Sequence, residues 1–340
     1  MLNDLTSVQF NEQFLEKIAT VQGQAELTEA GRQYVKIELM EAAFSRAIIP
    51  QEPITTADCQ RNTNDNSLYV IRDIEPGVEA VGVDNLGEPD GSYVKGTRYI
   101  IPIINLATKR FQITVEDLRA YQYKITKRIE DKSVPILEKL EDKYFLRLLG
   151  VAVSGGTAAE KVRKYTGSTS LTVAATDFIT LKNTLASGIN GSDPKRKEVG
   201  AILMCQEVFE TIVTLPSAGD DFGKDRVLNG IVSDTLYGTK TIRTIKSDIL
   251  PQGHLFAFTT PDFLGHNFAL GDPNFEIKSN FGLIEWQTKE AVGMNIGNRL
   301  SVALLTLKGS VAPGTSTNLE VTTDGTTDAA ITAYYKAIQI

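Results

Sequence analysis

The sequence predicts an α+β fold with a helical arm, an extended β-hairpin loop, a long spine helix and an α/β domain. Three observations support this prediction. Apolar residues recur at helical spacing near the start of the chain, a glycine-rich polar stretch separates two strand-like segments, and a helical pattern then runs over residues 114–150. With 42% apolar residues, a chain of 340 residues can bury a substantial core.

Two amphipathic helices are expected at the start of the chain. Phe10, Phe14 and Ile18 share one face of a helix over residues 7–21. A second helix is expected to begin at Thr28, a good N-cap residue, and to end before Pro50. Neither helix has an apolar partner nearby in the sequence, so its stripe must be buried elsewhere, with a neighbouring subunit as one candidate cover.

A long loop between two strands follows the helical arm. Residues 67–74 and 97–104 are rich in β-branched and aromatic side chains and are predicted strands. Pro102 cannot donate to a ladder, so the second strand is expected to be an edge strand or to be bulged. Residues 75–96 between them carry many glycines and charges, and loops of this length are usually functional. We expect the loop to reach outward.

The spine helix is predicted to begin at a capping box formed by Thr114 and Asp117 and to run to Gly150. At 1.5 Å per residue the helix would be about 50 Å long. Pro135 is expected to kink it, because proline removes one backbone hydrogen bond. Carboxylate pairs such as Glu141 and Asp142 alternate with lysines and arginines, which predicts a face that is solvated or salt-bridged to another subunit.

The second half of the chain predicts an α/β domain followed by a return to β-structure. Small polar residues at 151–175 are interpreted as a link, and Thr176 and Gly188 as the start and end of the next helix. The tail over residues 329–340 is apolar, and neighbouring subunits are its expected cover. The remaining predicted elements are strands at 200–205, 232–244 and 254–259, a helix at 207–215, and β segments at 281–296 and 299–307.

The sequence contains no residues that we assign to catalysis, to cofactor binding or to metal ligation. The only histidines are His254 and His266, which lack a nucleophile elbow and a metal-ligand spacing. Both are interpreted as surface or sheet-edge residues. The two cysteines, Cys59 and Cys205, are too far apart for a disulfide framework and are expected to be buried, reduced thiols.

The net charge of −7 bears on possible partners. A protein that grips DNA by its phosphates needs an excess of lysine and arginine, so gripping DNA is not expected to be the main task. Enclosing DNA without sequence-specific contact remains compatible with this charge. Apolar stretches long enough to span a bilayer and a signal peptide are both missing, so we expect a soluble, cytoplasmic protein with no membrane partner.

Three segments resemble the major capsid proteins of tailed bacteriophages. Residues 233–238 (SDTLYG) and 249–253 (ILPQG) are similar to a passage of that family in which a Leu-aromatic-Gly turn precedes Pro-x-Gly. Residues 290–303 (EAVGMNIGNRLSVA) are similar to its late strand pair. The resemblance extends over residues 25–308 in the order and spacing of the elements, and it implies the Hong Kong ninety-seven-type capsid fold.

The resemblance implies a structural protein that is not an enzyme and has no cofactor. It would self-assemble through hexamers and pentamers into an icosahedral shell around a double-stranded DNA phage genome, in the host cytoplasm, and would remain in the virion. Scaffold, portal and decoration proteins are further partners that it allows. The implied divisions are an N-terminal arm at 1–60, an extended β-hairpin loop at 61–110, a peripheral domain with the spine helix at 111–165 and 271–310, an axial domain at 166–270 and a C-terminal extension at 311–340.

Contacts between subunits are expected on the loop, the spine helix and the arm. The candidate contact residues are Asp84, Gly87, Asp90, Lys95, Arg98, Pro135, Tyr34 and Phe44.

Two alternatives remain open at this stage. An encapsulin shell has the same fold but encloses enzymes, and the long N-terminal arm favours the phage interpretation over it. An α/β enzyme of unknown type is the other alternative. A sizing column separates these classes, since an enzyme forms a small closed oligomer and a shell protein elutes as capsomers or at megadalton size.

Deleting residues 79–93 is expected to leave a folded subunit that no longer assembles, because the polar loop adds no apparent core. Circular dichroism would report the folding and sedimentation the assembly. Shells of normal size and yield from this deletion would contradict the expected role of the loop.

Overall fold

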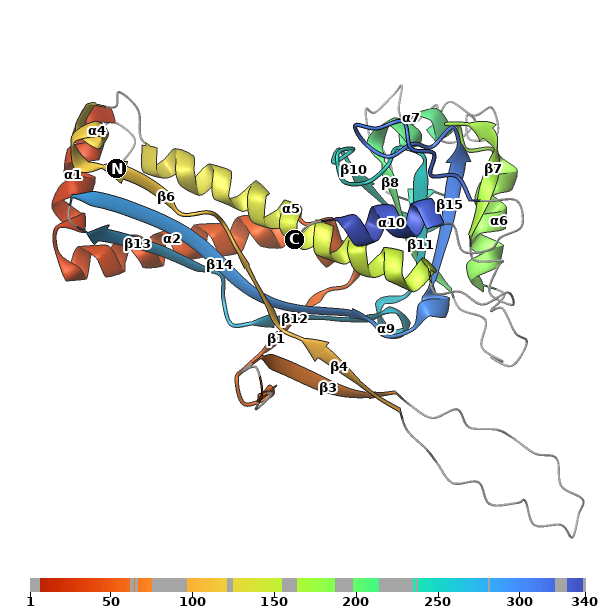
Figure 1. Ribbon diagram of the computed structural model, residues 1–340, viewed down its shortest axis with the longest axis horizontal. Coiled ribbons are helices and arrows are strands. Elements are labelled where there is room, and N and C mark those ends of the chain that lie inside the picture. Colours follow the sequence, from red (N-terminus) through yellow and green to blue (C-terminus); the bar gives the residue numbers. More distant parts are fainter. Residues whose placement is uncertain are drawn as a thin grey trace, which may run out of the picture.

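The computed structural model describes residues 7–61, 64, 67–74, 97–120, 125–154, 164–186, 198–213, 235–236, 238–280, 282–321 and 329–338. In these residues the strands form three sheets. Figure 1 shows an elongated part, in which α2, α5 and β14 run lengthwise, and a compact α/β part at one end. The predicted mixture of helices and strands is confirmed.

The helices are α1 Ser7–Ile18, α2 Val21–Ala42, α3 Phe44–Ile48, α4 Val115–Ala120, α5 Ile125–Ser154, α6 Ala175–Ala186, α7 Gln206–Val213, α9 Pro261–Leu264 and α10 Ala329–Ala337. The strands are β1 Gln51–Ile54, β2 Gln60–Arg61, β3 Leu68–Ile74, β4 Thr97–Pro102, β5 Ile104–Ala107, β6 Phe111–Thr114, β7 Lys164–Ser170, β8 Val199–Cys205, β9 Thr235–Leu236, β10 Thr239–Thr244, β11 His254–Thr259, β12 Gly265–Leu270, β13 Asn274–Asn280, β14 Leu283–Ile296 and β15 Val302–Lys308.

The two N-terminal helices pack on their own chain. Thr20, rather than Thr28, is the N-cap of α2, and its hydroxyl accepts a hydrogen bond from the amide of Gly23 at 3.1 Å. The ring of Phe14 stacks on Trp286 with 6.4 Å between ring centroids. The apolar stripe of α1 is therefore covered within the chain, and the expectation that a neighbouring subunit would cover it is wrong for this helix.

The first sheet, called the long sheet here, has the order β1-β12-β14-β13, with β5 and β6 also paired to β14. Side chains of α1, α4 and α5 meet its apolar face in one buried cluster around Phe275 and Trp286. Gly31 of α2 lies so close to this sheet that a Cβ atom there would be 2.3 Å from the ring of Phe275. Of the two β segments predicted at 281–296 and 299–307, the first is β14 of this sheet and the second is β15, which belongs to the other six-stranded sheet. The strands β1, β6, β12 and β13 were not predicted.

The second sheet, called the compact sheet, has the order β7-β15-β11-β8-β10-β9. Successive side chains of β11 point to opposite faces. Leu255 and Ala257 pack with α6 and α7, whereas Phe256 and Phe258 pack with α5 and α10. Because both faces are covered by helices, its central strands read as nearly continuous apolar runs.

The spine helix α5 continues through Pro135 and ends at Ser154, beyond the predicted end at Gly150. Its 30 residues correspond to about 45 Å. The predicted cap at the start of α4 is confirmed in part, since the hydroxyl of Thr114 accepts a hydrogen bond from the amide of Asp117 at 3.0 Å and donates one to the carboxylate of Asp117 at 2.7 Å. The predicted link at 151–175 is wrong in part, because it contains the end of α5 and the strand β7.

The helix α6 begins at Ala175, one residue before the predicted cap Thr176. Gly188, its predicted end, lies outside the described residues. The strand β4 pairs only with β3 in the part of the chain that the structure describes, so Pro102 does lie on an edge strand.

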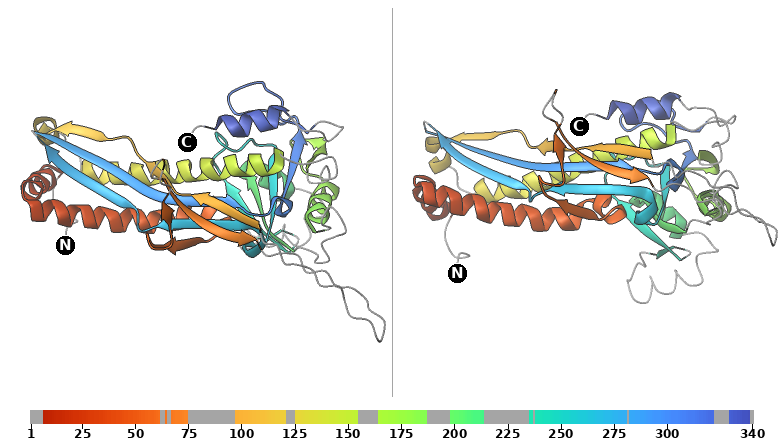
Figure 2. Two further views of the ribbon diagram at one scale, coloured as in Figure 1. Left: turned by 60° about the horizontal axis from the view of Figure 1, so that its bottom comes forward. Right: turned by 90° about the horizontal axis from the view of Figure 1, so that it is seen from below.

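The C-terminal helix α10 is held against α5 and the compact sheet, as Figure 2 shows. Gly150 permits this approach, because a Cβ atom there would be 2.1 Å from Cβ of Tyr335. Tyr335 is completely buried. The apolar tail is therefore covered by its own chain over residues 329–338, and not by neighbouring subunits as expected.

His254 is buried on the central strand β11, so its predicted place at a surface or sheet edge is wrong. Its Nε2 lies 3.1 Å from the carbonyl oxygen of Leu319, which can only accept a hydrogen bond. Nε2 therefore carries the proton, and Nδ1 accepts a hydrogen bond from the hydroxyl of Tyr335 at 2.7 Å. Burial lowers the pKa of His254 to about 4, which favours this neutral form.

Replacing Tyr335 by phenylalanine is expected to lower the free energy of unfolding by about 1–3 kcal/mol, because Nδ1 of His254 would lose its buried donor. Tyr334→Phe is the matched control, since its hydroxyl donates to the carbonyl of Ile249 in a partly exposed place where water can substitute. Chemical denaturation measures both. Equal losses for the two variants would contradict the role assigned to the His254 hydrogen bond.

Candidate functional site

A buried cluster of charged side chains joins the spine helix to its neighbours. We call it the charge cluster, and its members are Arg46, Glu138, Glu141, Asp142, Lys246 and Glu290. The three acidic residues of α5 lie at i, i+3 and i+4 and therefore share one helix face. Arg46 comes from α3, Lys246 from the segment after β10, and Glu290 from β14.

Arg46 connects two carboxylates. Its Nε lies 3.0 Å and 2.9 Å from the two carboxylate oxygens of Glu141, and its Nη2 lies 2.5 Å from Oε1 of Glu290. All three side chains are almost completely buried. This contact fixes α3 and β14 on the same side of α5.

Lys246 makes the second half of the cluster. Its Nζ lies 2.5 Å from Oδ2 of Asp142 and also contacts the carboxylate of Glu138. The other oxygen of Asp142 accepts a hydrogen bond from the amide of Ser45 at 3.1 Å. These contacts hold the segment between β10 and β11 of the compact sheet against the same face of α5.

Glu141 and Asp142 were predicted on a face that is solvated or salt-bridged to another subunit, and this prediction is wrong. Both side chains are completely buried in their own chain. The charge pattern along α5 does not distinguish a solvated face from one that is covered by oppositely charged side chains distant in the sequence. The burial of Glu290 could have been predicted from the sequence. Glu290 has the same strand parity as the apolar residues Val292 and Met294, so its side chain points to the same face of the strand.

The electrostatics of the charge cluster favour protonation of one of its carboxylates. Four carboxylates face two cations, Arg46 and Lys246. Burial raises the pKa of Glu141 to about 7, although the guanidinium of Arg46 acts in the opposite direction. Burial likewise raises the pKa of Asp142 to about 6 against the opposing effect of Lys246. The cluster can therefore hold and release a proton near neutral pH.

The predicted subunit-contact residues fall in different places. Arg98 lies exposed on β4, and Pro135 lies on the exposed side of α5. Phe44 is only 5% exposed and its ring packs against Phe145, so this residue lies in the core of its own chain and not at the surface. Tyr34 belongs to α2, but its side chain lies outside the described part. Asp84, Gly87, Asp90 and Lys95 lie outside the described residues.

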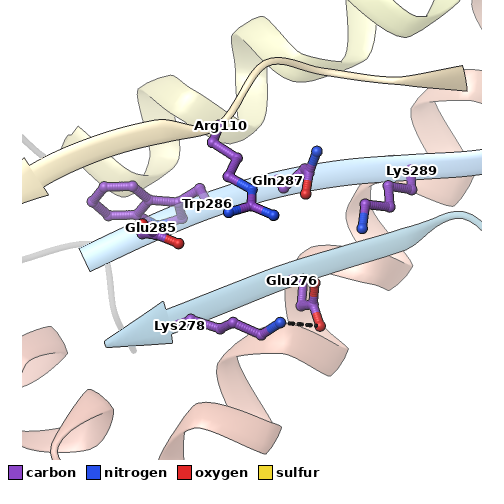
Figure 3. Close-up of a pocket in the computed structure, with 7 residues that line it drawn as sticks. All are labelled: Arg110, Glu276, Lys278, Glu285, Trp286, Gln287 and Lys289. Atoms are coloured by element: carbon purple, nitrogen blue, oxygen red, sulfur yellow. Dashed lines mark ion pairs between the residues drawn. The ribbon is translucent and has the colours of Figure 1, made fainter. Parts of the chain in front are cut away.

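The exposed face of the long sheet carries side chains of both charges. Figure 3 shows Arg110, Lys278 and Lys289 near Glu276 and Glu285. These side chains line a hollow of about 70 Å³. Lys278 and Glu276 form an ion pair of 3.0 Å, and the hydrogen bond from Lys278 holds the pKa of Glu276 below its usual value. The hollow is too small for more than a few water molecules.

Across the described residues, acidic, histidine and cysteine side chains do not gather in groups of three or more that could hold a metal ion. The same residues include no helix long and apolar enough to cross a bilayer.

Comparisons with known proteins agree on the fold. Neither a protein-family model nor a curated protein matches this sequence. A capsid asymmetric unit of cyanophage Pam1 is similar with a TM-score of 0.54 and 10% identity, over 78% of this chain and 89% of that one. The capsid structure of cyanophage P-SCSP1u gives 0.53 and 12% identity, over 76% and 86%. The mature capsid asymmetric unit of bacteriophage PhiM1 gives 0.52 and 10% identity, over 79% and 88%.

These similarities extend over most of both chains, and they confirm the predicted fold class. The chain has the Hong Kong ninety-seven-type fold.

The charge cluster predicts a dependence of stability on pH. The pKa of Glu141 is about 7 in the folded chain, against an ordinary value of 4.5 that applies to the unfolded chain. Its contribution to stability is therefore fully present below pH 4.5 and is lost as the pH rises through about 7. Between pH 5 and pH 8 the loss should be about 2 kcal/mol.

Glu141→Gln is expected to flatten this pH profile in chemical denaturation, and Asp142 should account for a remaining slope of the same sign. The exposed Glu116→Gln on α4 is the matched control and should keep the wild-type profile. A wild-type slope retained by Glu141→Gln would mean that Glu141 does not take up the proton.

Proposed function

We propose that this chain is the major capsid protein of a tailed phage. It self-assembles through hexamers and pentamers into an icosahedral shell that encloses a double-stranded DNA genome. The observation that carries this proposal is the similarity to the capsid asymmetric unit of cyanophage Pam1 over 78% of this chain and 89% of that one. Such coverage extends over most of both chains, rather than over one common motif.

A structural role without enzymatic activity fits the same fold. In this fold the chain's task is to pack against copies of itself, so its function resides in surfaces and not in a catalytic cleft. The net charge of −7 suits a shell that encloses DNA without gripping it. Assembly would take place in the host cytoplasm, with the protein ending in the virion, where scaffold, portal and decoration proteins are further candidate partners.

Two of the proposed contacts between copies lie on exposed parts of the chain that the structure describes. These are Arg98 on β4 and Pro135 on α5. The loop residues Asp84, Gly87, Asp90 and Lys95, together with Tyr34, remain proposed contacts. The division into arm, hairpin loop, peripheral domain, axial domain and C-terminal extension is likewise proposed as the organisation of the subunit in the shell.

Sedimentation velocity of the purified protein tests the proposal. Capsomers or a narrow boundary of megadalton particles are expected, because each subunit in a shell contacts several others. Mild denaturant that dissociates the particles should give subunits that reassemble after dilution, which separates shells from aggregates. A small closed oligomer at every concentration would contradict the proposed function.

A further inference from the structure

The C-terminal helix α10 is held in place by an aromatic side chain that reaches into the core. The ring of Tyr335 packs edge-on against Phe256 of β11, with 5.8 Å between the ring centroids. Its hydroxyl donates a hydrogen bond of 2.7 Å to Nδ1 of His254. Tyr335 and His254 are both completely buried. This hydrogen bond therefore joins α10 to the compact sheet in a place that water does not reach.

The imidazole of His254 uses both of its nitrogens. Its Nε2 donates a hydrogen bond of 3.1 Å to the carbonyl oxygen of Leu319. Leu319 belongs to the segment between β15 and α10, and its side chain is also completely buried. A neutral imidazole has one donor and one acceptor, which is the combination that these two partners require. His254 thus holds α10 and the segment before it against the same strand.

A second proton on His254 is incompatible with this arrangement. It would make Nδ1 a donor, and the hydrogen bond that the Tyr335 hydroxyl donates would be lost. The imidazolium would also be a buried charge, which is costly without an ionised partner. The carboxylates of Asp248, Glu207 and Glu320 belong to segments that meet this end of the compact sheet, but none of them acts on His254.

The other titratable groups around His254 stay neutral in the pH range in which histidines titrate. Tyr334 and Tyr335 come from α10, and Cys205 comes from the neighbouring strand β8. Burial raises the pKa of Tyr334 and of Cys205 to about 12. It raises the pKa of Tyr335 well above 10. In the part of the chain that the structure describes, these groups offer a protonated His254 no negative charge.

Release of α10 can hydrate His254 without unfolding the compact sheet. His254 is the first residue of β11, so it lies at an end of the sheet, where Tyr335 occupies Nδ1. The helix α10 has 9 residues, and isolated helices of this length are not stable in water. Short elements near a chain end open locally at a lower free energy than global unfolding requires.

We propose that α10 is a strap released by acid, in which protonation of His254 breaks the hydrogen bond to Tyr335 and lets the helix leave the compact sheet. Release would uncover Phe256 and the part of α5 around Gly150, which Tyr335 covers. The inference concerns a single subunit and goes beyond the proposed function, so the two are tested independently.

Acidification should increase the fraction of chains with α10 detached. The pKa of His254 is about 4 in the folded chain, against an ordinary value of 6.5 for a hydrated imidazole. The stabilising effect of the neutral imidazole is fully present above pH 6.5 and is lost as the pH falls through about 4. Between pH 7.5 and pH 5 the detached fraction should rise roughly thirtyfold. The charge cluster has the opposite dependence, because Glu141 contributes most at low pH.

Hydrogen exchange of the full chain, followed by mass spectrometry, tests the inference. Protection factors of the α10 amides are compared at pH 7.5 and pH 5, after correction for the intrinsic exchange rate. The amides of α6, on the other face of the compact sheet, are the reference. His254→Gln keeps a donor and an acceptor but does not titrate. His266→Gln is the matched control, since it removes a partly exposed histidine on β12 of the long sheet.

Protection of α10 should fall roughly thirtyfold at pH 5 in the wild type and in His266→Gln, while that of α6 changes little. In His254→Gln the protection of α10 should be the same at both pH values. Unchanged protection of α10 in the wild type, or a fall that His254→Gln retains, would overturn the inference.

If His254→Gln fails to fold, the imidazole of the wild type decides the question. Nuclear magnetic resonance of the chain labelled with carbon-13 in its 2 histidines reports the charge of each ring. The charged form of His254 should appear only together with the loss of α10 protection. A charged His254 in chains whose α10 amides stay protected would show that the proton does not release the helix.

Discussion

The charge cluster on α5 is the interaction on which the rest of the structure depends. It connects the spine helix to α3 and β14 through Arg46, and to the segment before β11 through Lys246. A buried ion pair contributes little net stability compared with apolar packing, but loss of one partner leaves an uncompensated buried charge that costs about 3–5 kcal/mol. The cluster thus specifies how α5 meets the long sheet and the compact sheet more than it stabilises either of them.

Local sequence signals were sufficient for the elements whose stability is local. The capping box of Thr114 and Asp117, the strand β3 and the buried strand β11 were predicted, because hydrogen-bonding side chains and apolar periodicity act within a few residues. The fold class followed from the order of such elements. The end of α5 was predicted too early, because Gly150 is usually a stop signal and here permits Tyr335 to pack closely.

The errors concern contacts between residues that are distant in the sequence. Glu141 and His254 were assigned to surfaces because charged and titratable side chains are usually exposed. Their partners, Arg46 and Tyr335, lie 95 and 81 residues away. The same reason explains why a neighbouring subunit was expected to cover the C-terminal tail. A single sequence shows that an apolar stripe needs a cover but not which segment supplies it.

The elongated long sheet, the spine helix and the compact sheet form one continuous subunit (Figure 1).

Cryo-electron microscopy of the purified particles tests the central claim most directly. The account predicts closed icosahedral shells whose hexamers and pentamers are built from this fold, with α5 lying along each subunit. Particles of a few subunits with closed point-group symmetry, or shells whose subunits have another fold, would contradict it.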